Sequence, residues 1–299
     1  MFGALSLIGP AESMALASSL LYALTLVAIR HGLQGGTPLA AVLTINTIVC
    51  LGGLTGSLLR GTLLSSSLAP LLFFALSGMA GQGIGAVAHY IGIERMGVSR
   101  STLVQSITPI WGAVFAVAVL GERPAPPVWA GTLMIVGGMF LLAAPEEEDG
   151  DFRSWLRAAL VYPLLSSVVY ALVPIFAKLA FAHQRTPLVG MAVAFAMGNT
   201  ILILGRPLLP GGGPVRASRR SFWLFALGGV FNLFASYLLW SAFLIGDIST
   251  VLPMSRFYPL FLIFFSFFLL REFERLSGRL LLATGCIVAG GVLVAAFRA

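Results

Sequence analysis

The feature that most constrains this chain is a segment that occurs twice. Residues 18–24 read Ser-Ser-Leu-Leu-Tyr-Ala-Leu, and residues 166–172, 148 positions later, read Ser-Ser-Val-Val-Tyr-Ala-Leu. Arg30 corresponds to Lys178 at the same shift, and Pro109 corresponds to Pro259 at a shift of 150. The second half is therefore predicted to be a structural copy of the first, with one repeat packed against the other.

Composition places both copies in a membrane. Of the 299 residues, 58% are hydrophobic and only 10% are charged, which is more apolar surface than a soluble domain of this length buries. The net charge of +7 does not indicate a nucleic-acid partner, because the arginines are spread over short connectors. Cys50 and Cys286 both lie in apolar runs, so no disulfide framework, metal site or cofactor is expected.

Ten apolar runs of about 20 residues, each long enough to cross a hydrocarbon core of about 30 Å, predict an all-α membrane protein. They fall at roughly 11–30, 38–59, 70–93, 98–120, 125–144, 157–180, 187–207, 221–245, 248–270 and 278–297. Residues 1–145 and 157–299 thus form two five-helix repeats, joined by an acidic linker at 146–156. Because five is odd, the copies enter the membrane in opposite directions, and the fold is predicted to be a ten-helix, 5+5 inverted repeat.

The distribution of Lys and Arg predicts the orientation. Of the 18 such residues, five lie on the side of the two termini, twelve lie on the other side, and Arg256 lies within a span. The side richer in positive charge is normally cytoplasmic. We therefore expect a multi-pass protein of the bacterial inner membrane with both termini outside.

Several motifs resemble the EamA-type drug/metabolite transporter superfamily. They are the stretch YIGIERMGVS at 90–99, Pro109 in the next span, and LGE at 120–122; the second half has GDIS at 246–249, Pro259, and LRE at 270–272. The resemblance implies a ten-helix exporter of amino acids, other metabolites or cationic drugs. The predicted outward termini and the aromatic residues make YddG-like exporters of aromatic and neutral amino acids the most similar type.

Polar residues near the middle of the spans are the candidate site. If a two-fold axis in the membrane plane relates the repeats, aligned positions such as Tyr22 and Tyr170 face a shared cavity. The predicted substrate-binding residues are Tyr22, Gln82, His89, Tyr90, Gln105, Ser106, Trp111, Tyr170, Asn232, Tyr237, Trp240, Ser255, Arg256 and Tyr258. Ser106 aligns with Arg256 at the proline shift, and Pro109 and Pro259 are predicted to bend their helices for gating. The alternative is that these side chains only bond neighbouring helices.

Three parts of this site carry specific hypotheses. Arg256 is suited to bind a carboxylate in bidentate fashion, or alternatively pairs with a backbone carbonyl or extends outward. His89 is the one candidate for proton coupling, or alternatively a packed, hydrogen-bonded histidine. Trp111, Tyr237 and Trp240 form an aromatic wall, or alternatively belong to the membrane interface.

These residues favour transport over other functions. No carboxylate is predicted at mid-membrane, which argues against a proton-driven exporter of cationic drugs. We expect a monomeric secondary exporter of amino acids and similar small metabolites that works by alternating access. The alternatives are a multidrug or sugar-phosphate/nucleotide-sugar transporter, and a membrane scaffold without transport. An enzyme is not expected, because HExxH, GxSxG and paired membrane aspartates are all absent from the sequence.

Overall fold

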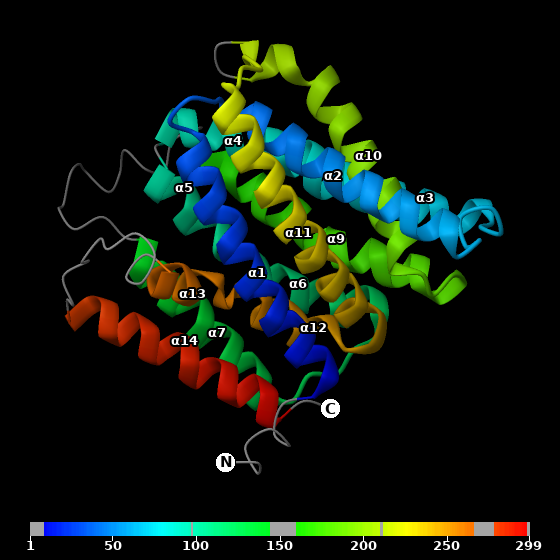
Figure 1. Ribbon diagram of the computed structural model, residues 1–299. Helices are drawn as coiled ribbons and strands as arrows, with labels where there is room; N and C mark the ends of the chain where they lie inside the picture. The colour runs from blue at the N-terminus through cyan, green and yellow to red at the C-terminus, as the bar shows by residue number, and fades with distance from the viewer. Residues whose placement is uncertain (1–8, 97, 144–159, 210–211, 266–277, 298–299) are drawn as a thin grey trace.

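The computed structural model describes residues 9–96, 98–143, 160–209, 212–265 and 278–297. Within these ranges every regular element is a helix, and one isolated bridge pairs Gly36 with Ala217 (Figure 1). The all-α prediction is therefore confirmed. The linker at 146–156 and the motif at 270–272 lie outside the described residues, so the predicted repeat boundaries stay a prediction.

The helices follow the predicted spans closely. In the first half they are α1 (Pro10–Gly32), α2 (Pro38–Leu59), α3 (Leu68–Gly78), the π-helix η2 (Met79–Gly85), α4 (Ala86–Met96), α5 (Val98–Gln105), α6 (Thr108–Phe115), the π-helix η3 (Ala116–Leu120) and α7 (Pro126–Ala143). In the second half they are α9 (Val161–His183), α10 (Pro187–Leu204), the 3-10 turn η5 (Arg206–Leu208), α11 (Arg219–Ile245), α12 (Ile248–Met254), the 3-10 turn η7 (Ser255–Phe257), α13 (Tyr258–Phe265) and α14 (Gly278–Ala296). Among the described residues, nine helical stretches are long and apolar enough to cross a membrane, and α7 is a shorter apolar helix.

The packing of the helices repeats the sequence duplication. Helix α1 packs on α11 and α13, and its copy α9 packs on α3, η2 and α6. Helix α2 packs on its copy α10, and α7 packs on its copy α14, as the paired ribbons in Figure 1 show. Each repeat therefore contributes the same helix pairs, which is the arrangement expected of a 5+5 fold with a two-fold axis.

The repeated segment itself joins the two halves. The Ser18 hydroxyl donates to the Ala235 carbonyl oxygen on α11 at 2.7 Å, and the Ser166 hydroxyl donates to the Gly85 carbonyl oxygen on η2 at 3.0 Å. Both serines are buried, where a hydroxyl without a partner is costly. The first helix of each repeat is thus bonded to the third helix of the other repeat.

Prolines interrupt two spans at matching places. Pro109 has no N–H for the Gln105 carbonyl, which accepts instead from the Thr108 hydroxyl at 2.6 Å. Two serine hydroxyls each bond a carbonyl three residues back, Ser106 to Leu103 and Ser255 to Leu252, both at 2.7 Å. Each turn thus has a serine hydroxyl that satisfies a backbone carbonyl.

The starts of the flanking helices keep the register of the prolines. Val98 and Ile248 begin α5 and α12, and Thr108 and Tyr258 begin α6 and α13, in both cases 150 positions apart. The predicted pairing of Ser106 with Arg256 has the same shift, so the second repeat carries a charged side chain where the first carries a hydroxyl.

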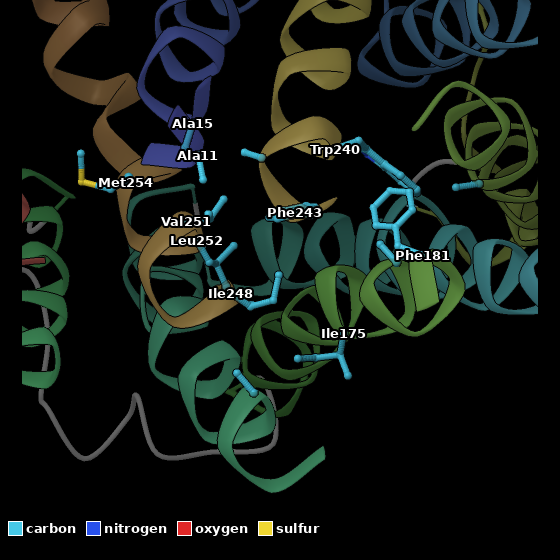
Figure 2. Close-up of a cluster of buried hydrophobic side chains, with 14 of the residues drawn as sticks. Ala11, Ala15, Ile175, Phe181, Trp240, Phe243, Ile248, Val251, Leu252 and Met254 are labelled. Atoms are coloured by element: carbon cyan, nitrogen blue, oxygen red, sulfur yellow. The ribbon is translucent and has the colours of Figure 1, made fainter. Parts of the chain in front are cut away.

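The core is densest around α12. All seven of its residues are buried, and they pack with Ala11 and Ala15 of α1, Ile175 of α9 and Phe243 of α11 (Figure 2). Beyond the turn, α13 has no buried residue. Burial therefore changes abruptly at η7, which carries Arg256.

Candidate functional site

Arg256 is the centre of the candidate site. It is the middle residue of η7, between the buried α12 and the unburied α13. Its Nε atom is buried without a hydrogen-bond partner. No hydrogen bond or ion pair to Arg256 occurs within the described part of the chain. Because a buried donor without a partner is costly, an acceptor from outside the protein would stabilise this N–H group of the half-buried side chain.

Four tyrosines form a cluster that includes this cation. The Tyr22 and Tyr258 rings meet edge to face, with centroids 5.3 Å apart and an interplanar angle of 89°. Tyr22 and Tyr170 both lie close enough to Arg256, and to each other, for electrostatic interaction, and Tyr90 is within the same reach of both of these tyrosines. The structure thus brings together residues from α1, α4, α9, η7 and α13.

Tyr22 shows that this cluster borders an accessible space. Its side chain is 38% exposed, although Tyr90, Tyr170, Tyr258 and Arg256 lie near it on four other elements. A lipid-facing side chain would not have neighbours on so many elements. We therefore interpret its exposed surface as facing the interior.

Glycines of η2 hold Tyr170 in place. A Cβ atom at Gly85 would lie 3.1 Å from the Tyr170 ring and 2.7 Å from the Ala80 carbonyl oxygen, and a Cβ atom at Gly81 would lie 3.8 Å from the same ring. Positions 81 and 85 lie one helical turn apart, so together they form the surface on which the ring rests. The glycine-rich run of the third span therefore positions a site residue as well as packing helices.

Other predicted site residues lie close by but have structural partners. The Gln105 amide donates to the Ser166 hydroxyl at 3.2 Å, so it extends the bond between repeats. Ser106 and Ser255 bond their own helices, and the Nδ1 atom of His89 lies 3.4 Å from the Ser101 hydroxyl. For these residues the helix-bonding alternative describes the observed contacts.

The remaining predicted residues are not brought to Arg256. Gln82 packs against α10, where a Cβ atom at Gly198 would lie 2.2 Å from the Gln82 Cβ atom. Asn232 and Tyr237 are half-buried on α11. Trp111 stacks on Phe115 with centroids 6.5 Å apart, and its buried indole Nε1 has no hydrogen-bond partner.

Trp240 is a correction to the predicted aromatic wall. It is 4% exposed and packs on Phe74 and Phe181, with ring centroids 5.8 and 6.2 Å away. Gly190 makes room for it, since a Cβ atom there would lie 2.4 Å from the indole ring. Trp240 therefore belongs to the core.

Sequence reasoning missed three charged residues around the start of α12. Glu122 accepts hydrogen bonds from the backbone N–H groups of Ile248 and Ser249, and the buried Glu12 accepts one from the Thr250 hydroxyl. Lys178 lies inside α9 and donates to the Gly246 carbonyl oxygen. The alignment of Lys178 with Arg30 was the one signal that could have found it.

The side chains of this site are suited to binding a small molecule. A guanidinium offers a planar fork of donors for a carboxylate, and phenol rings offer apolar faces with hydroxyl groups at their edges. Within the described ranges, no three His, Cys, Asp or Glu side chains are grouped so that they could hold a metal ion. The cluster therefore has the elements of a site for a small molecule that carries a carboxylate and an apolar group.

These features define a multi-pass membrane protein whose two five-helix repeats meet at a central polar cluster, as in secondary transporters. The model of the EamA-like transporter family matches residues 9–144 and again 157–296, and the chain belongs to this family of membrane transporters. A solved crystal structure, titled only as that of a protein, superposes with a TM-score of 0.75 over 95% of each chain at 18% sequence identity, and so shows the same fold. No curated protein matches the chain.

Proposed function

We propose that this transporter exports amino acids, with a preference for aromatic and neutral ones, as the resemblance to YddG-like exporters implies. The observation that carries the proposal is the unpaired Arg256 guanidinium among Tyr22, Tyr90, Tyr170 and Tyr258. The substrate carboxylate would bind the guanidinium, and its side chain would pack on the tyrosine rings. The direction, export, is proposed from the same resemblance, and the predicted outward termini are one of the features that carry it.

The alternatives have less support. A cationic drug would be repelled by Arg256, and the Asp and Glu residues of the described part lie at helix ends, at positions 12, 94, 122 and 247. A sugar phosphate or nucleotide sugar would require several cations at the site. Lys178, within α9, already donates to the Gly246 carbonyl oxygen.

Proteoliposome flux of labelled phenylalanine and leucine tests the proposal. Arg256→Gln would leave the substrate carboxylate without its cation, which costs about 2 kcal/mol or more and should lower transport efficiency at least about thirtyfold. Arg220→Gln, at the exposed start of α11, is the matched control and should transport like the parent. Absence of flux for every neutral amino acid, or equal flux in the parent and Arg256→Gln, would reject the proposal.

A further inference from the structure

Three charged side chains hold the start of α12. Glu122 accepts from the backbone N atom of Ile248 at 2.7 Å with one carboxylate oxygen and from that of Ser249 at 2.9 Å with the other. Glu12 accepts from the Thr250 hydroxyl at 3.0 Å, and Lys178 donates to the Gly246 carbonyl oxygen. We refer to Glu12, Glu122 and Lys178 as the clamp.

The clamp joins both repeats. Glu12 lies on α1 and Glu122 follows η3, both in the first repeat, whereas Lys178 lies on α9 in the second. Glu122 satisfies N–H groups that a helix start leaves free, and its negative charge suits the positive end of the helix. Four segments distant in sequence therefore converge at one end of the bundle.

Between the clamp and Arg256 the side chains of α12 are buried. Ile248 and Val251 are fully buried, and Figure 2 shows Val251 close to Ala11 at the α1–α12 contact. A Cβ atom at Gly246 would lie 2.3 Å from the Ala11 Cβ atom, so α1 approaches the start of α12 more closely than a side chain at position 246 would permit. On the clamp side, the site is closed.

The opposite end of the bundle differs. Arg30 is the repeat equivalent of Lys178, but it is exposed, whereas Lys178 is half-buried. Leu160 stands at the position that corresponds to Glu12. Tyr22, halfway along α1, is accessible, while Ala15 two turns earlier is fully buried. Among the residues that the structure describes, the positions equivalent to Glu12 and Lys178 therefore differ from the clamp in side chain or in burial.

We propose that the clamp locks a gate formed by α12 against α1, and that breaking it is the step that opens the site on the side of the chain termini. This inference rests on the transport function proposed above and adds its regulation. Because η7 continues directly from α12, release of the clamp would also move Arg256, so that opening the gate and loosening the bound carboxylate occur together.

Thiol accessibility tests the gate without any substrate. The native cysteines are replaced by Cys50→Ala and Cys286→Ala, and Val251→Cys places a reporter in the buried region. In the solubilised parent this reporter should be unreactive toward a charged methanethiosulfonate reagent. Lys178→Met and Glu122→Gln should each raise its labelling rate about tenfold or more, since each removes a hydrogen bond to a charged group.

Arg95→Met is the control, because the Arg95 guanidinium lies 4.5 Å from the Tyr162 ring centroid, away from the clamp, and its loss should leave labelling unchanged. If the clamp variants label at the parent rate, the clamp is a static cap and the proposal fails. If Arg95→Met labels as fast as they do, general loosening explains the result and the proposal again fails.

A reversible lock provides the second test, which does not depend on the stability of the clamp variants. Glu12→Cys with Thr250→Cys, in the same background, replaces one clamp contact by a pair of thiols that oxidation can join. Oxidised protein should lose at least about nine-tenths of its flux, and reductant should restore it; undiminished flux after full crosslinking would overturn the gate. If labelling responds as expected but no amino acid is transported, the gate stands and the proposed substrate is wrong.

Discussion

Gly78 provides a sharp test of how closely the two repeats approach. It ends α3 against α10, and a Cβ atom built there would lie 2.0 Å from the Ala194 carbonyl oxygen and 2.5 Å from the Ala194 Cα atom. Gly228, on α11 of the other repeat, has a nearest contact of 3.3 Å, to the Ala28 Cβ atom. Both positions are helical, so alanine gains up to about 1 kcal/mol of helix propensity at each.

The contacts decide whether the gain in helix propensity or the steric overlap dominates the free energy of unfolding. At Gly78 the atoms in the way are backbone, so α3 and α10 must separate, and overpacking of this kind costs about 3 kcal/mol or more. Gly78→Ala should therefore be destabilised by about 2 kcal/mol, whereas Gly228→Ala should be neutral or slightly stabilised. The difference corresponds to about 4 °C or more in the melting temperature of a chain of this size.

Differential scanning fluorimetry in detergent measures this difference. Because the obstacle at Gly78 is backbone, Ala194→Gly should not rescue Gly78→Ala. Gly83→Ala is the contrasting case: its Cβ atom would meet the Ile201 Cβ and Cγ2 atoms, both at 2.8 Å, so in an Ile201→Gly background, which lacks both atoms, Gly83→Ala should cause no further destabilisation. Equal melting temperatures for Gly78→Ala and Gly228→Ala, or rescue by Ala194→Gly, would refute the reasoning.

The same melting assay tests three further variants. Ser166→Ala leaves the buried Gly85 carbonyl without its donor and should cost about 1–3 kcal/mol, whereas Ser19→Ala, which loses only a bond within its own helix, should cost less; the reverse order would contradict the cross-repeat role. Trp240→Ala empties a core position and should cost about 3–5 kcal/mol; a change below 1 kcal/mol would mean that the side chain is not in the core. Gly121→Ala forces a side chain onto φ = 71° and should cost about 1–2 kcal/mol, and an unchanged melting temperature would argue against that backbone conformation.

The fold was predictable because hydrocarbon imposes a simple rule. Each membrane span must satisfy its own backbone hydrogen bonds, so a long apolar run forms a helix whichever apolar side chains it carries. The predicted runs at 38–59 and 98–120 begin and end where the structure has helices, and the two predicted repeats pack against each other. The π-helix over 79–85 was not predicted, since it depends on how Tyr170 and α10 pack against four closely spaced glycines.

From the sequence, candidate site residues could be selected only by their depth within the membrane spans. Tyr22, Tyr170 and Arg256 were chosen because they are polar at mid-span, and the structure brings them together. Depth does not say which face a side chain occupies, so Trp240 was placed at the site although it faces the core, and Gln82 although it faces α10. Glu12 and Lys178 lie near helix ends, where charges are ordinary, and only the tertiary contacts show that they meet at α12.

The difference between Ser106 and Arg256 connects these observations. The two turns before the prolines occupy the same place in the repeats, and each has a serine hydroxyl that satisfies a backbone carbonyl. At the shift of 150, the first repeat has Ser106 where the second has Arg256. The two repeats can therefore exchange conformations while only one of them carries the charge. Asymmetry at the centre and the clamp at one end of the same helix then act on one element, so that substrate binding and opening on that side are mechanically coupled.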